Sequence, residues 1–436
     1  MTRVHPERRP VNSWINVRTD LRQLYAAYSQ TNSPPATDEM LPPPGTPSAP
    51  GLSGETTAET ASDSSAGTNV SIEVAAAGVL EALGEAEALL EELQTAGRRP
   101  YSRFNIQYDA DPYRILLPHL AALRGVASIL QVRATAQLAV GRPQEACEDT
   151  VEIFHMSNAL RHEPFLISYL VRLAQLQFAI KTIAEGLEQQ RWSDAHLAAF
   201  QKELAHLDLL KEGRSALEAE RAFHGELIDR IRRISDRWTT FSELSAPMDP
   251  VSLPTAWQRL LANSIPDGWF YFERANYSRL FQDYLLPPLK IEERRVDVAL
   301  CNRNDQDISA TINRSGPALF LRHYAFSRIL LPSGSKAIQR MALGQTGLDI
   351  TGLACALERY RLAQGKYPDT LDALVPQYVA RLPHDVIDGK PLRYRLQADG
   401  RFVLYSVGWN QTDDGGKLAR GRSDKTTDPS QGDWMW

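Results

Sequence analysis

The chain has 436 residues, 43% of them apolar, and carries a formal net charge of −5 at pH 7. This length allows two or three domains, and the charge gives no general attraction to nucleic acid or to an anionic membrane. The three cysteines, Cys147, Cys301 and Cys355, show no CxxC spacing, which indicates free thiols rather than a zinc site or a disulfide framework.

The first 70 residues divide into two predicted segments. In residues 1–30, apolar side chains recur along SWINVRTDLRQLYAAYSQ at helical spacing, which predicts one short helix. Residues 31–70 are rich in Pro, Ser, Thr and Gly and contain few apolar side chains. Such a composition cannot offset the entropy of ordering, so we expect a disordered linker.

Residues 71–245 are predicted to form a helical-hairpin domain, because apolar residues recur there every three or four positions. Ser193 is placed to cap one helix at its start. The stretch around Ala134, Gly141 and Ala146 resembles one tetratricopeptide hairpin, although no 34-residue period repeats around it. The expected helices cover about 79–96, 113–140, 144–160, 165–187, 194–207 and 212–238.

Residues 246–336 form a predicted aromatic-rich helical extension. Two runs, GWFYFERANYSRLFQDYLLPPL and ALFLRHYAFSRILLPSG, are expected to be helices, separated by a polar loop near CNRNDQD. Their aromatic rings are interpreted as core packing against the preceding domain, and an aromatic-lined ligand groove is the alternative.

Residues 337–436 combine helix and strand signals. An apolar stripe predicts a long helix that ends at Gly365, and Pro368 prevents its continuation. A short helix, TLDALV, follows, with Asp369 and Asp372 as a capping pair. PLRYRLQ and RFVLYSVG alternate in a strand period across the turn ADG, which predicts an antiparallel hairpin lying against the long helix.

This C-terminal segment resembles the globular head of the major pseudopilin of bacterial type II secretion. The resemblance rests on ALERYRLAQGKYPDTLDALV, LPHDVIDGKPLRY and YSVGWNQTDDGG, between residues 356 and 416. More loosely, the whole chain resembles planctomycete-type bacterial proteins that join such a head to a helical region. The resemblance implies an α+β fold that is predominantly α: a helical-hairpin domain, then a head of one long helix, one short helix and a small antiparallel sheet.

In pseudopilin heads, the loop after the last strand often binds calcium. The resemblance therefore implies a Ca²⁺ site at Asn410, Asp413, Asp414 and Asp433, with Asp424 and Asp428 as possible substitutes. Calcium prefers six to eight oxygen ligands, which an acidic glycine-rich loop can supply. A solvated acidic loop is the alternative, because Asn410 replaces an aspartate of the family and the insert KLARGR weakens the negative potential.

An enzyme hypothesis rests on carboxylate and imidazole pairs in the helical domain. Glu220 and His224 are one helical turn apart, and Glu148, Glu152 and His155 follow one side of another helix. Such pairs can bind a metal inside a bundle, although surface polarity explains the same pattern and no repeated Glu-x-x-His pairs occur. A basic run, IDRIRRISDR, contains interleaved aspartates and indicates a solvated helix face.

These observations favour a non-catalytic interaction or scaffold protein, with a metal-dependent enzyme as the alternative. We expect protein partners, with envelope or secretion components as the candidates, and no binding to nucleic acid. The apolar runs are short and broken by arginine, so no membrane span is expected, and no pilin leader or signal peptide is evident. The chain as written is expected to be cytoplasmic, or anchored in the envelope if its true start lies upstream.

Overall fold

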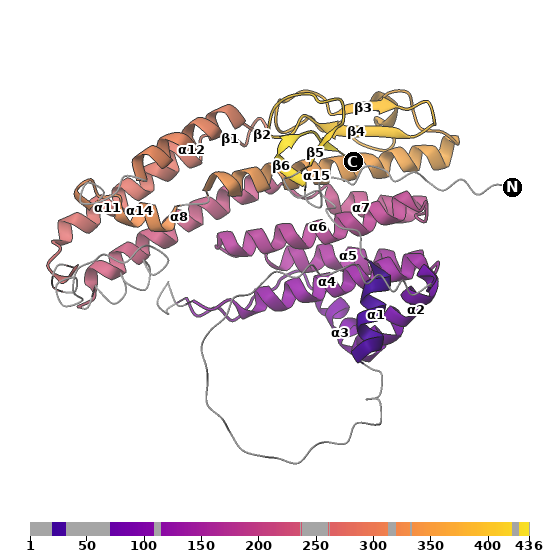
Figure 1. The fold of residues 1–436 in the computed structure, drawn as a ribbon, viewed down its shortest axis with the longest axis horizontal. Coiled ribbons are helices and arrows are strands. Elements are labelled where there is room, and N and C mark those ends of the chain that lie inside the picture. Colours follow the sequence, from indigo (N-terminus) through magenta and orange to yellow (C-terminus); the bar gives the residue numbers. More distant parts are fainter. Residues whose placement is uncertain are drawn as a thin grey trace, which may run out of the picture.

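A computed structural model describes residues 20–31, 70–108, 115–235, 237, 260, 262–312, 320–331, 334–420 and 427–435. In these ranges the fold is predominantly helical, with small antiparallel sheets toward the C-terminus, as the sequence predicts (Figure 1). The predicted linker at 31–70 lies almost entirely outside the described residues. Within them, no helix is both long and apolar enough to cross a membrane.

The described residues between 20 and 233 form a stack of helices close to the predicted ones. The predicted helix at 79–96 is divided, because a single 3₁₀ turn at Gly84–Ala86 separates α2 from α3. Ser193 caps α7 as predicted: its hydroxyl accepts from the amide of His196, and the ring of His196 accepts from the amide of Ser193. The helices are α1 (Leu21–Thr31), α2 (Ile72–Leu83), α3 (Glu87–Gly97), α4 (Pro118–Ala139), α5 (Pro143–Ala159), α6 (Leu166–Glu188), α7 (Asp194–Leu204) and α8 (Leu209–Arg233).

The α4–α5 hairpin confirms the small-residue pattern read from the sequence. Ala134 and Ala146 are completely buried, and Gly141 takes a left-handed φ of 80° in the turn between the helices. A buried ion pair also joins the two helices, since Arg133 donates to Asp149 at 2.7 Å. Small side chains at the crossing let the two backbones approach, while the arginine fixes their register.

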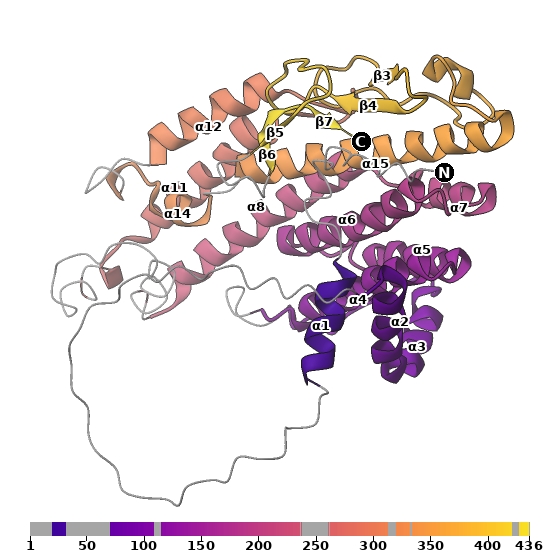
Figure 2. The same ribbon diagram turned by 45° about the vertical axis from the view of Figure 1, so that its right-hand side comes forward.

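The segment between α8 and the last hundred residues, which we call the arm, extends along α8 toward one end of the molecule (Figures 1 and 2). It contains α11 (Asp267–Leu280), a π-helical turn at Phe281–Leu285, strands β1 (Leu289–Lys290) and β2 (Arg295–Val296), α12 (Val298–Ile312) and α14 (Ala325–Leu330). α11 packs along α8, and α14 packs on α11.

One prediction for this arm was wrong, and another holds only in part. The expected polar loop near CNRNDQD is part of α12, because Val298, Cys301, Ile308 and Ile312 form a buried stripe and the polar side chains mostly face outward. The second aromatic run is helical as predicted but interrupted: Phe320 and Leu321 are helical, the chain turns at His323, which has a φ of 59°, and α14 follows.

The last hundred residues wrap a small sheet onto one long helix, α15 (Gly334–Gln364). α15 ends at Gly365 as predicted, with φ at 77°. β3 (Arg393–Leu396) and β4 (Phe402–Ser406) form the predicted antiparallel hairpin, and β7 (Trp434–Met435) pairs on the other side of β4. A second hairpin joins β5 (Leu418–Arg420) to β6 (Thr427–Gly432).

The predicted capping pair in this head was wrong. The short helix is a 3₁₀ turn at Leu371–Leu374 that follows Thr370, and no side chain caps it. It is held instead by burial of Leu371 and Leu374 in the core.

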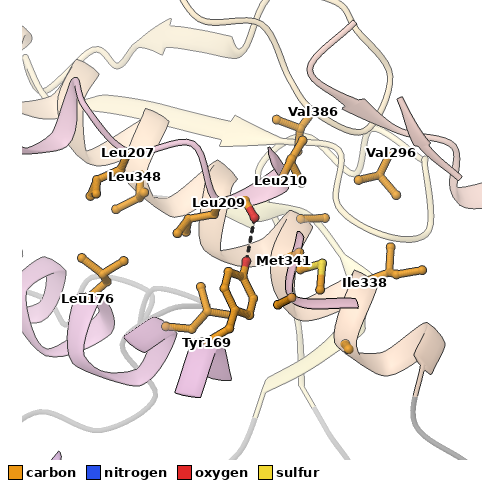
Figure 3. Close-up of a cluster of buried hydrophobic side chains, with 14 of the residues drawn as sticks. Tyr169, Leu176, Leu207, Leu209, Leu210, Val296, Ile338, Met341, Leu348 and Val386 are labelled. Carbon is orange, nitrogen blue, oxygen red and sulfur yellow. Dashed lines mark hydrogen bonds between the residues drawn. The ribbon is translucent and has the colours of Figure 1, made fainter. Parts of the chain in front are cut away.

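One continuous apolar core joins the helical stack to the head. Figure 3 shows its centre, where side chains of α6, α15, the α7–α8 connection and the head meet; the hydroxyl of Tyr169 donates to the carbonyl of Leu209 at 2.7 Å. The amide of Val296 in β2 donates to the carbonyl of Val386 in the head at 2.7 Å. α15 therefore packs on the sheet with one side and on α6, α7 and α8 with another. The boundary predicted at 336/337 stays a prediction, although the core is continuous across it.

Candidate functional site

The predicted calcium ligands lie in one loop, which is organised around Asp433. The carboxylate of Asp433 is buried and accepts backbone amides of Asp414 at 3.2 Å, Gly416 at 2.7 Å and Lys417 at 3.3 Å. Burial raises the pKa of Asp433 above its usual value, and the three amides oppose that shift. Asp433 thus connects the start of β7 to the loop that follows β4.

The other three predicted ligands lie on the exposed side of the same loop. The side-chain amide of Asn410 donates to Asp414 at 3.0 Å, and Asp413 accepts from the hydroxyl of Tyr405 at 2.9 Å and from the amide of Gly415 at 3.0 Å. The Gly415 and Tyr405 hydrogen bonds lower the pKa of Asp413. The loop is therefore acidic and ordered by its own hydrogen bonds.

The four residues share a loop without forming a ready cation cage. Across the ranges that the structure describes, no three His, Cys, Asp or Glu side chains are grouped closely enough to hold a metal. A cation at this loop would have to share the carboxylate of Asp433 with three amide donors. Of the two substitutes, Asp424 lies outside the described residues, and Asp428 accepts from Ser430 in a local turn. The calcium site stays a prediction.

A second carboxylate, which the sequence did not single out as a site, holds the head together. Asp385 is completely buried and accepts from the hydroxyl of Ser406 at 2.8 Å, the amides of Ile387 at 3.0 Å and Val407 at 3.1 Å, and Arg393 at 3.1 Å. Burial raises the pKa of Asp385, against these donors. Because it joins the turn before β3 to the end of β4, Asp385 positions the acidic loop that follows β4.

Glu220 and His224 meet a third side chain that sequence spacing did not reveal. The Nε2 atom of His224 lies 3.6 Å from Oε1 of Glu220, and its Nδ1 atom lies 2.6 Å from the hydroxyl of Tyr277 on α11. Glu220 also accepts the amide of Leu166 at 3.4 Å, at the start of α6. The cluster therefore joins α6, α8 and α11.

Burial shifts the pKa of each of these three groups toward its uncharged form. It lowers the pKa of His224 to about 4, raises the pKa of Glu220 and raises that of Tyr277 well above its usual value. At neutral pH the imidazole is neutral, so Tyr277 can donate to Nδ1 while the Nε2 proton faces Glu220. These groups can exchange hydrogen bonds, and a neutral imidazole is also the form that binds metals.

The remaining predicted polar residues do not share one site. Glu152 accepts from His155 at 3.2 Å, whereas Glu148 accepts from Gln144 at 2.8 Å. In the basic run, Arg232 and Arg237 both pair with Asp267 on α11, at 3.2 and 2.7 Å. These arginines hold α8 against α11 rather than only facing solvent.

The fold and these sites define a predominantly helical α+β protein in which a small antiparallel sheet is mounted on a long helix inside a helical stack. No protein-family model, curated protein or solved structure matches the chain.

Proposed function

We propose that this protein is a non-catalytic interaction or scaffold protein that presents its pseudopilin-like head to a protein partner. One observation carries the proposal: α15 is held between the sheet and helices α6, α7 and α8. The head is thereby fixed to a rigid support, and a preorganised surface loses little conformational entropy when it binds.

The exposed parts of the head supply the contact surface. β3 is an edge strand of the sheet, and its Arg395 is exposed. The acidic loop at 410–415 follows the C-terminal end of β4. Edge strands and charged loops are common recognition elements. A secretion or envelope component is the partner that the resemblance to pseudopilins suggests.

Deleting the head would be a poor test, because α15 contributes completely buried side chains such as Ile338 and Leu357 to the common core. A photo-crosslinking residue at Arg395 in the full chain avoids this problem. We expect a specific protein adduct from Arg395 and none from the same residue placed at Arg124, which is exposed on α4. Identical adducts from both positions, or none from Arg395, would reject a partner bound at the head.

Within this proposal, bound Ca²⁺ would stabilise the conformation of the acidic loop. We expect Ca²⁺ to raise the melting temperature of the full chain and EDTA to reverse the change. Asp414→Asn should abolish the shift, whereas Asp372→Asn, an exposed carboxylate elsewhere in the head, should leave it intact. A melting temperature that ignores Ca²⁺, with no heat of binding, would remove calcium from the proposal.

A metal-dependent enzyme is the second candidate, because His224 and Glu220 do lie together in the helical stack. It predicts that the purified protein retains stoichiometric iron, manganese or zinc, and that Glu220→Ala or His224→Ala loses the metal. Metal retained by the parent chain and lost in both variants would replace the scaffold proposal.

A further inference from the structure

We propose that the free end of the arm is a peripheral docking surface for an anionic lipid membrane. Four large apolar side chains form what we call the arm-end patch: Tyr271 and Phe272 on α11, and Phe320 and Leu321 before α14. Their side chains are 53%, 60%, 38% and 72% exposed, respectively. Figures 1 and 2 place α11 and α14 at one end of the molecule, away from α1–α3.

The patch is held in place by specific contacts. Trp269 stacks on Phe320 with ring centroids 4.5 Å apart, and its Nε1 donates to the carbonyl of Phe320 at 2.8 Å. Phe272 stacks on His323 at 5.0 Å, and Asn276 donates to the carbonyl of His323 at 3.0 Å. These bonds join the segment before α14 to α11. The segments that carry the apolar side chains are therefore fixed relative to each other.

Two exposed arginines lie beside the patch. Arg279 on α11 and Arg322, next to Leu321, have no ion pair among the described residues. Arg232 lies over the ring of Tyr271, 4.7 Å from its centroid, but its charge is paired with Asp267. Glu273 is completely buried and accepts backbone amides, whereas Asp283, just after α11, is exposed. The two unpaired arginines therefore outnumber the exposed acid, while the chain as a whole has a net charge of −5.

Apolar side chains with flanking arginines match the chemistry of a membrane interface. Aromatic rings and leucine enter the boundary between headgroups and acyl chains, while arginines contact anionic headgroups. Nucleic acid fits less well, because it needs many unpaired cations along its phosphates, whereas Arg232, Arg237 and Arg274 are paired with Asp267 or Asp229 and the patch itself is apolar. The docking is peripheral and uses side chains alone, in keeping with the lack of a spanning helix in the described ranges.

Vesicle flotation with the full chain tests this surface. We expect binding to vesicles of phosphatidylcholine mixed with phosphatidylglycerol, and much weaker binding to phosphatidylcholine alone. Phe272→Ser with Leu321→Ser should lower the partition coefficient about tenfold or more, since both apolar side chains leave the interface. Tyr101→Ser with Leu116→Ser, which removes two exposed apolar side chains elsewhere, should not change it.

The charge requirement is tested separately. Arg279→Glu with Arg322→Glu should weaken binding by about tenfold or more at low salt, and salt should weaken binding of the parent chain. Arg124→Glu with Arg191→Glu, two exposed arginines of the helical stack, should have a much smaller effect. Circular dichroism and melting temperature verify that all four variants fold.

Three results would overturn the proposal: no binding of the parent chain to anionic vesicles, equal binding by the patch and control variants, or self-association that light scattering detects and Phe272→Ser with Leu321→Ser abolishes. The last result would assign the patch to an interface between copies of the chain. None of these outcomes affects the crosslink expected at Arg395, so this surface and the head can fail independently.

Discussion

The hydroxyl of Tyr277 on α11 lies 2.6 Å from Nδ1 of His224 on α8, within hydrogen-bond distance, although the two residues are 53 positions apart in the chain. Tyr277 is completely buried. Tyr277 can donate to Nδ1 only when the imidazole is neutral, so this contact couples the packing of α11 on α8 to the protonation of one histidine.

His224 should make the protein less stable in acid. Its pKa is about 4 in the folded chain, against an ordinary value of 6.5, because burial disfavours the charged ring. The unfolded chain therefore binds more protons in this window, so the contribution of His224 is complete above pH 6.5 and is lost as the pH falls toward 4. Its size is about 3 kcal/mol. Urea unfolding at several pH values should show this slope reduced in His224→Gln and unchanged in His162→Gln, an exposed control.

Glu273 should produce the opposite slope. Burial raises its pKa from 4.5 to about 7, although amides of Ala325 and Phe326 oppose the shift. The folded chain then binds more protons between these values, so stability contributed below pH 4.5 is lost as the pH rises through 7, by about 3 kcal/mol. In Glu273→Gln the free energy of unfolding should rise more steeply with pH from 4.5 to 6.5 than in the parent, because the opposing contribution of Glu273 is removed while that of His224 remains. An unchanged slope would show that Glu273 does not titrate in this range.

Asp385 should be among the most sensitive positions of the head. Asp385→Ala leaves the amides of Ile387 and Val407 and the hydroxyl of Ser406 without their buried acceptor. We expect a loss of about 3 kcal/mol or more in the free energy of unfolding, measured with chemical denaturant. Asp372→Ala, at an exposed carboxylate of the same head, should change it by about 0.5 kcal/mol at most. Equal effects would contradict the anchoring role of Asp385.

The same substitution should have opposite effects at two helical glycines. Gly125 in α4 is exposed with open space around its Cβ position, so Gly125→Ala should stabilise by about 1 kcal/mol. At Gly186 in α6, a Cβ atom would lie 2.2 Å from the ring of Trp192. Gly186→Ala should therefore destabilise by about 1 to 3 kcal/mol through overpacking. Thermal unfolding of the two variants measures both signs, and stabilisation by Gly186→Ala would show that the Trp192 ring moves aside at little cost.

Short-range patterns predicted most helices because their causes are local. The Ser193 cap, the left-handed end of α15 at Gly365 and the β3–β4 hairpin all depend on residues a few positions apart. The polar run in α12 misled because its polar side chains mask a buried stripe that repeats every three or four residues. The capping pair predicted at Asp369 and Asp372 was wrong because packing of Leu371 and Leu374 replaces a side-chain cap.

The sequence by itself determined most of the helical segments, where α15 ends, and that Glu220 and His224 share one helical face. Only the tertiary structure decided that Tyr277 completes their cluster, that Asp433 accepts three amides from the loop after β4, and that Phe272 stacks on His323. The physical reason is the range of the forces involved. Helix periodicity and capping act between neighbouring residues, whereas burial and long-range hydrogen bonds depend on which distant segments the common core brings together.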